Sequence, residues 1–356
     1  MLGAIYRIRR TAAPRVGDPR GLEISWSSLD PDALVERLDD PRPAVRRLVI
    51  ERLAEKKEAA IPALRHLVES KSRSPEARQN AVWALARIDH ADARSAVRAA
   101  LADPDADVRQ AGLNVVSLWR DREAVRDLLR VLQIGTAMNR RVAAESLGRI
   151  GDQSAVGPLL KAAEQPTDRF LHHAITYALI EIGDADSVAR IGLASENPSV
   201  LRSALMAIDQ MPGGKLAADV VVSRLSTNDS ELKETLLWIA GRHAEWGEKL
   251  AGYFRGELDG ISSKPPVAQN ELQSLLARLS GSPAIQSLVG KALSAKKTSA
   301  TTTNLVLGVV EQSGLQQLPE EWVAALVELL ERGSPDLVPR VIDTVRRAAS
   351  SRGRIE

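Results

Sequence analysis

An internal repeat of about 31 residues constrains the fold of this chain more than any other feature. Five segments align without gaps, and each carries a large apolar residue 32, 31, 31 and 32 positions after its predecessor. A basic side chain lies seven positions before each of these residues. The series continues less regularly to Ile208 and Ile239. The apolar positions are Leu53, Leu85, Val116, Leu147 and Leu179, and the basic anchors are Arg46, Arg78, Arg109, Arg140 and His172.

Each repeat has the pattern of two helices. A short apolar stretch such as 124–132 comes first, and a break containing Pro or Asp follows, as at 103–106. The second stretch carries the basic anchor and an apolar stripe with a spacing of four, and two of these stretches end in Ile-Gly-Asp. One such hairpin cannot bury both of its faces, so neighbouring hairpins must stack. The pattern predicts an all-α protein, an α-solenoid of helical hairpins.

The regularity of the repeat divides the chain into four predicted regions. Residues 1–28 form an extended lead-in, and 29–250 form the repeats. Residues 251–270 contain Gly, Ser and two prolines and are expected to form a loop or linker. Residues 271–356 return to apolar helical stretches, which we interpret as degenerate repeats with a polar cap at the end. The total is about nine or ten helical pairs.

Composition excludes several classes of site. The chain has no cysteine, which rules out disulfides and thiolate chemistry within it, and its net charge is only +2. No apolar run is long enough for a membrane span or a signal peptide. We therefore expect a cytoplasmic protein without membrane contact, or an exported one if the sequence is a fragment of a longer chain.

The repeat unit resembles the HEAT repeat, especially the short bacterial form also found in phycobilin lyases. The resemblance rests on Pro41, Val45 and Arg46, on the matching Pro104, Val108 and Arg109, and on Asp40 and Asp103, each six positions before an Arg. It implies HEAT-like hairpins in a right-handed superhelix, with the second helices on the concave side. It also implies a ladder of Asp and Arg residues between adjacent repeats.

The N-terminal sequence has a second resemblance. Residues 3–10 and 18–26, followed by 38–47, are similar to the junction between a β-propeller and HEAT repeats in planctomycete-type membrane-bound dehydrogenase-like proteins. This likeness implies that residues 3–10 are a remnant of a final propeller strand. No Cys-x-x-Cys-His haem site is present, and no dehydrogenase residues can be assigned.

The sequence contains no recognisable catalytic or cofactor motif. No two of its five histidines are four apart, as a helical zinc site would require. Residues 211–215 contain two glycines and a lysine but lack phosphate-loop spacing, and no carboxylate pair or nucleophile elbow is apparent. We therefore predict no enzyme activity, no cofactor and no metal site.

A candidate binding face lies one and five residues after each basic anchor. These two positions share a helix face that differs from the apolar stripe. The basic anchors themselves are expected to act as internal struts, with Asp40 and Asp103 placed to pair with them. Aromatic residues and Arg dominate binding hot spots, although Trp83 and Tyr177 could instead be ordinary core residues. The candidate residues are Arg47, Glu51, Gln79, Trp83, Arg141, Glu145, His173, Tyr177, Arg202 and Met206.

These features favour a non-catalytic scaffold or interdomain module that binds another protein or domain through the concave face. One alternative is the HEAT segment of a propeller dehydrogenase-like protein, and another is a chaperone of bilin attachment. A third is a nucleic-acid-binding solenoid like the HEAT-type DNA glycosylases, which the near-neutral charge disfavours. The sequence leaves the oligomeric state open.

Overall fold

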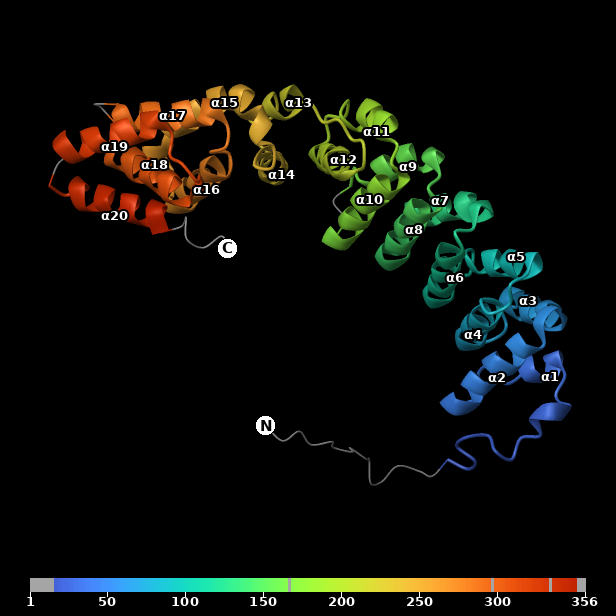
Figure 1. Ribbon diagram of the computed structural model, residues 1–356. Coiled ribbons are helices and arrows are strands. Elements are labelled where there is room, and N and C mark those ends of the chain that lie inside the picture. The colour runs from blue at the N-terminus through green and yellow to red at the C-terminus, as the bar shows by residue number, and fades with distance from the viewer. Residues whose placement is uncertain (1–15, 166–167, 296–297, 333–334, 351–356) are drawn as a thin grey trace, which may run out of the picture. The chain divides into compact units, whose positions relative to one another are not determined.

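The computed structural model describes residues 16–165, 168–295, 298–332 and 335–350, and all regular structure within these ranges is helical (Figure 1). Twenty α-helices follow one another there, joined by short turns and 3-10 segments. The predicted all-α solenoid is therefore confirmed, and the twenty helices correspond to ten successive pairs. The chain divides into two compact units, residues 1–184 and 185–356.

In the first unit, five hairpins stack so that second helices lie beside second helices and first helices form the other layer (Figure 1). The first helices are α1 (Pro31–Val35), α3 (Ile61–Glu69), α5 (Ala91–Ala100), α7 (Val125–Ile134) and α9 (Val156–Ala162). The second helices are α2 (Pro43–Glu55), α4 (Pro75–Leu85), α6 (Ala106–Trp119), α8 (Ala137–Ile150) and α10 (Arg169–Ile182).

Capping residues set the ends of the second helices. The Asp105 carboxylate accepts hydrogen bonds from the backbone N–H groups of Asp107 and Val108 at the start of α6. A polar cap of this kind stabilises a helix by about 1 kcal/mol. At the other ends of α8 and α10, Gly151 and Gly183 adopt φ values of 73° and 72°, the left-handed exit expected from the two Ile-Gly-Asp sequences.

The repeated apolar positions form the core of the first unit. Leu53, Leu85, Val116, Leu147 and Leu179 are all fully buried. Helices α8 and α10 approach especially closely at Gly148, where an added Cβ would lie 2.7 Å from the Cα of Ala178. A residue with no side chain is therefore required for this packing.

The lead-in differs from the prediction where it is described. Residues 16–28 form turns and a short 3-10 helix (Trp26–Ser28) rather than extended chain. The Trp26 indole donates a hydrogen bond to the Gly21 carbonyl, and the Asp18 carboxylate pairs with Arg42 of the first hairpin. These contacts bend the segment back onto the repeats. The propeller-like residues 3–10 lie outside the described residues.

The second unit also consists of helical pairs. Its helices are α11 (Ala185–Gly192), α12 (Pro198–Gln210), α13 (Ala218–Val222), α14 (Ser230–Ala240), α15 (Gly247–Asp259), α16 (Pro266–Arg278), α17 (Pro283–Ser294), α18 (Ala300–Gln312), α19 (Glu320–Arg332) and α20 (Leu337–Ser350). Ile208 and Ile239, which extend the repeat series, are buried on α12 and α14.

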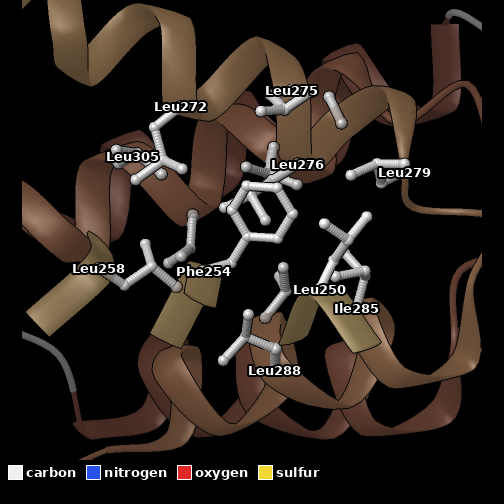
Figure 2. Close-up of a cluster of buried hydrophobic side chains, with 14 of the residues drawn as sticks. Leu250, Phe254, Leu258, Leu272, Leu275, Leu276, Leu279, Ile285, Leu288 and Leu305 are labelled. Atoms are coloured by element: carbon white, nitrogen blue, oxygen red, sulfur yellow. The ribbon is translucent and has the colours of Figure 1, made fainter. Parts of the chain in front are cut away.

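The predicted loop at 251–270 is wrong, because most of it is helical. Leu250, Phe254 and Leu258 are four residues apart on α15, and all three are buried in the core of the second unit (Figure 2). Pro266 lies in the first turn of α16, where a proline costs no hydrogen bond. The prolines therefore mark the start of a helix, and the glycines and serines between the helices form only a short turn.

Candidate functional site

The eight candidate residues of the first unit lie on the second-helix layer, four of them exposed and four half-buried. We call this set the second-helix face: Arg47 and Glu51 of α2, Gln79 and Trp83 of α4, Arg141 and Glu145 of α8, and His173 and Tyr177 of α10. None of them is buried. Because α2 packs on α4, α4 on α6, α6 on α8 and α8 on α10, the fold presents these positions on successive neighbouring helices.

The two aromatic residues of the face are exposed to solvent. The Trp83 side chain is 36% exposed and Tyr177 is 50% exposed, so neither is an ordinary core residue. The His173 ring stacks on the Tyr177 ring, with 6.4 Å between ring centroids and 19° between ring planes. This stacking holds the tyrosine ring on the helix surface, which reduces the entropy lost when a partner covers it.

The sequence analysis missed three apolar residues on the same helix surfaces. Phe170 precedes His173 by three residues and Met138 precedes Arg141 by three, so each shares a helix side with a candidate residue. Phe170 is 56% exposed and its ring lies 5.0 Å from the Arg169 guanidinium, while Leu118 on α6 is 73% exposed. The i, i+3 spacing could have identified Phe170 and Met138. We call Met138, Phe170 and Tyr177, on the adjacent helices α8 and α10, the apolar patch.

The charges on the second-helix face partly neutralise one another. The Arg141 Nε atom lies 3.5 Å from the Glu145 Oε1 atom on the same helix. A protein partner of either charge would therefore meet no strong electrostatic repulsion at this face. A nucleic acid would find no concentration of positive charge to bind its phosphates.

The remaining two candidates belong to the second unit. Arg202 and Met206 are half-buried on α12, and the Arg202 guanidinium forms an ion pair with Glu231 at the start of α14. The structure brings them close to each other on one helix. They are therefore not counted in the second-helix face, which is defined by the eight residues of the first unit.

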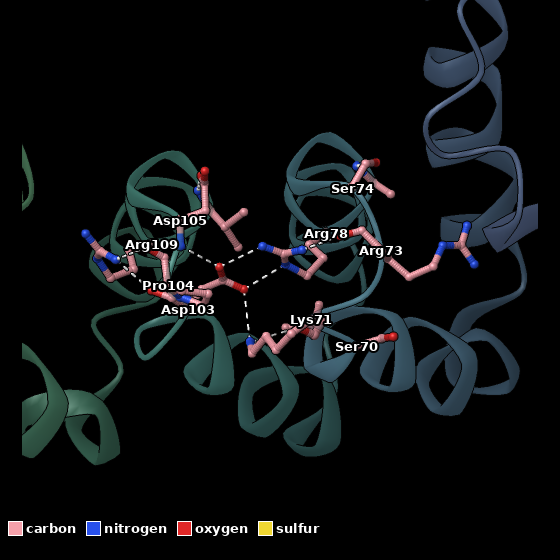
Figure 3. Close-up of polar contacts among 12 residues, drawn as sticks. Ser70, Lys71, Arg73, Ser74, Arg78, Asp103, Pro104, Asp105 and Arg109 are labelled. Atoms are coloured by element: carbon pink, nitrogen blue, oxygen red, sulfur yellow. Dashed lines mark hydrogen bonds and ion pairs between the residues drawn. The ribbon is translucent and has the colours of Figure 1, made fainter.

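The basic anchors make internal contacts, as predicted for struts. Arg78 is buried, and its guanidinium donates two hydrogen bonds to the Asp103 carboxylate of the next repeat, at 2.8 and 3.0 Å (Figure 3). Arg109 donates to the backbone carbonyls of Asp103 and Pro104 and to the Asn139 side chain. Arg140 donates to the Leu132 carbonyl.

The expected partner of Asp40 is wrong. Its carboxylate pairs with Arg42, two residues later, while Arg46 donates to the Asp40 backbone carbonyl and pairs with Glu76. The hydrogen bond from Arg42, against a smaller opposing effect of burial, holds the pKa of the Asp40 carboxyl below its usual value. The Arg42 backbone N–H also donates to the Asp40 carboxylate, at 2.9 Å, so the turn itself holds Arg42 beside this carboxylate.

Asp103 is the most enclosed carboxylate of this network. Burial alone would raise the pKa of the Asp103 carboxyl, but hydrogen bonds from Arg78, from the Asp105 N–H and from Lys71 outweigh burial and lower it (Figure 3). The carboxylate is therefore charged at neutral pH and fully occupied with structural partners.

The described residues contain no group of three or more His, Asp or Glu side chains arranged to hold a metal ion. A cavity of about 730 Å³ lies between α14, α15 and α16, lined by Leu237, Trp238, Phe254 and Leu275 together with charged rim residues. Burial and the nearby Glu257 raise the pKa of Tyr253 in this cavity to about 12, so its hydroxyl stays protonated.

None of the described helices has the length and hydropathy needed to cross a bilayer.

Comparison with known families identifies the repeats. The family model described as HEAT repeats matches residues 31–117 and 96–180. Residues 31–180 therefore contain HEAT repeats. The HEAT matches cover α1 to most of α10, which is the part of the chain that carries the second-helix face. Comparison with curated protein sequences gives no match.

Solved structures with similar folds are also helical solenoids. Kap95p in a complex with RanGDP aligns with 94% of this chain at 12% identity and a TM-score of 0.55, and Kap95 in a Kap95:Nup1 complex aligns with 94% at 12% identity and 0.53. The chain spans about half the length of these Kap95 chains, 52% and 53%. Human deoxyhypusine hydroxylase aligns at 15% identity over 86% of this chain and 99% of its own, with a TM-score of only 0.30. At 12% identity the likeness to the Kap95 chains concerns the fold alone.

Proposed function

We propose that this chain is a non-catalytic scaffold or interdomain module that binds another protein through the second-helix face and the adjoining apolar patch of the first unit. The observation that carries the proposal is the exposure of Tyr177, Phe170 and Met138 on the neighbouring helices α8 and α10. Contiguous exposed apolar side chains with a polar surround are typical of protein-binding surfaces.

The rigidity of the underlying layer supports this function. Helices α8 and α10 are in contact along Gly148, and Leu147 and Leu179 are fully buried beneath the surface. A surface whose helices are already fixed loses little conformational entropy on binding. Within this unit the second-helix layer follows the inner side of the curve made by successive hairpins (Figure 1), which lets several helices contact one partner.

The structural relatives are consistent with this proposal. The two Kap95 structures are complexes with other proteins, RanGDP and Nup1. Their partners are not assigned to this chain. What they support is the general use of this fold to hold a protein ligand.

A nucleic-acid ligand is disfavoured by the contacts of the basic anchors. The guanidinium groups of Arg78, Arg109 and Arg140 are committed to carboxylate and carbonyl groups of the protein. They are therefore not available to replace counterions along a phosphate backbone. The propeller-junction alternative, which rests on residues 3–10 and 18–26, stays a prediction, since residues 3–10 lie outside the described part of the chain.

Site-specific photocrosslinking tests the proposed surface. A photoreactive amino acid replaces Tyr177 in one variant and Arg126, an exposed residue of the first-helix layer on α7, in a matched control. In cells that make the protein, we expect a discrete covalent adduct from position 177 that Phe170→Ala weakens, and no such adduct from position 126. A crosslink only from the control position, or none from 177, would argue against the assignment.

A salt titration separates the nucleic-acid alternative. The purified chain is mixed with labelled duplex and single-stranded DNA at low ionic strength, and fluorescence anisotropy is followed as salt is added. We expect no binding at low salt. Binding that weakens steeply with salt would favour the nucleic-acid solenoid over the scaffold.

A further inference from the structure

The hairpin α19–α20 packs on the preceding hairpin through defined polar contacts. On α19, the Trp322 indole donates a hydrogen bond to the Gln286 carbonyl of α17 at 2.7 Å. On α20, Thr344 donates to the Glu311 carboxylate of α18 at 2.8 Å, and Arg340 pairs with the same carboxylate. These contacts fix which side of each helix faces inward.

The opposite sides of both helices are apolar and exposed. Val323, Val327 and Leu330 are spaced as i, i+4 and i+7 on α19, and Ile342 and Val345 share a side of α20. Val323 and Val327 are 46% and 47% exposed. The side of this hairpin that faces away from α17 and α18 therefore carries an apolar stripe on each helix, while the polar cap predicted at the end of the chain stays a prediction. We call these five residues the end face.

We propose that the end face binds the end face of a second copy of this chain around a two-fold axis parallel to the helices. Such an axis places α19 of one copy against α20 of the other, in antiparallel orientation. The two helices have nearly equal lengths, 13 and 14 residues. Val327 then lies level with Ile342 of the second copy, and Val323 lies level with Val345.

The charges at the ends of these helices favour this pairing. Glu320 begins α19 with Glu321, while the last turns of α20 carry Arg346 and Arg347. Glu320 and Arg346 are both exposed. In the two-fold arrangement Glu320 of one copy lies beside Arg346 of the other, and the symmetry repeats the contact. A contact between two α19 helices would instead bring like charges together.

The size of the end face predicts a weak dimer. Helices of this length are about 20 Å long and about 10 Å wide, so two of them offer a small patch compared with the roughly 800 Å² per partner of a standard interface. The dimer should therefore dissociate on dilution. The inference does not depend on the partner-binding surface of the first unit.

Sedimentation equilibrium of the full chain over a wide concentration range tests the proposal. We expect the mass to rise from 38.5 kDa towards twice that value as concentration increases. Val327→Glu and Ile342→Glu should each keep the chain monomeric, whereas Val267→Glu, at an even more exposed valine on α16, should leave the dimer unchanged. Circular dichroism checks that each variant remains helical.

Charge reversal tests the specific pairing. Glu320→Arg should weaken dimerisation at least several-fold, and adding Arg346→Glu should restore it, because the double variant rebuilds both ion pairs with reversed signs. A monomer at every concentration, or a dimer that tolerates Ile342→Glu, would overturn the proposal. Failure of the double variant to recover would overturn the two-fold arrangement described here.

Discussion

The Arg78 guanidinium and the Asp103 carboxylate form a bidentate ion pair between adjacent repeats, with both side chains buried (Figure 3). Asp103 also accepts a hydrogen bond from the Asp105 N–H, so the same carboxylate orders the turn before α6. The pair joins the second helix of one repeat to the turn of the next. It therefore sets the register in which these two repeats stack.

Removing the Asp103 carboxylate should destabilise the first unit. Asp103→Ala leaves the Arg78 charge buried without its partner, and such a loss costs about 3–5 kcal/mol. Urea unfolding followed by circular dichroism measures the change. The control is Asp89→Ala, whose highly exposed carboxylate pairs with Arg94 and should contribute less than about 1 kcal/mol. Equal losses for the two variants would contradict the strut interpretation.

The stability of the second unit should depend on the protonation of His243. Its Nε2 lies 2.7 Å from the Asp209 carboxylate, its Nδ1 lies 2.5 Å from Glu245, and the ring stacks on Trp246. Burial alone would lower the pKa of His243, but the hydrogen bonds to Asp209 and Glu245 raise it above its usual value of 6.5.

A raised histidine pKa fixes the direction of the pH effect. The stabilisation is fully present below the unfolded value near 6.5 and is lost as pH rises through the higher pKa of the folded state. The difference in unfolding free energy between the wild type and His243→Gln should therefore shrink as pH rises. A difference that grows with pH would show that the neutral ring is the stabilising form.

Two glycine substitutions should have opposite effects on stability. At Gly148 a new Cβ would lie 2.7 Å from Ala178 Cα, so Gly148→Ala should separate α8 and α10 and cost about 1–3 kcal/mol. Gly252 on α15 has open space around an added Cβ, so Gly252→Ala should stabilise the protein by about 0.5–1 kcal/mol. Thermal unfolding of both variants provides the comparison. Stabilisation by Gly148→Ala would show that these helices can separate without cost.

Local patterns in the sequence were sufficient to predict the architecture of the first unit. The 31-residue spacing identified the buried positions from Leu53 to Leu179, and the Ile-Gly-Asp sequences identified two helix ends. Both features can be identified along the sequence itself, without knowing which distant residues contact one another in the fold. Helical spacing set Trp83 and Tyr177 apart from the apolar stripe but left a core position open for both, and only the structure shows that they are exposed.

Other features depend on three-dimensional geometry that these patterns do not determine. Asp40 has several arginines close to it in the sequence, and only the conformation of the turn shows that Arg42 binds its carboxylate. Pro265 and Pro266 suggested a loop, but Pro266 starts α16 because a proline fits the first helical turn. Arg202 and Met206 belong to the second compact unit and the other candidates to the first, a division that the repeat spacing does not reveal.

Aromatic substitutions on the second-helix face should leave the fold intact. Trp83 and Tyr177 keep much of their surface in solvent, so truncating each to Ala should cost far less than the about 3–5 kcal/mol typical of a buried aromatic residue. Urea unfolding of the two single variants checks this. A loss as large as that of Asp103→Ala would instead assign both residues to the core.

The binding affinity of the Trp83→Ala/Tyr177→Ala variant for the partner crosslinked at position 177 tests the central claim most directly. Isothermal titration calorimetry compares it with the wild type and with Arg126→Ala on the first-helix layer. We expect the double variant to bind at least about tenfold more weakly, as loss of two hot-spot aromatics requires, and Arg126→Ala to bind normally. Unchanged affinity of the folded double variant would contradict binding through the second-helix face.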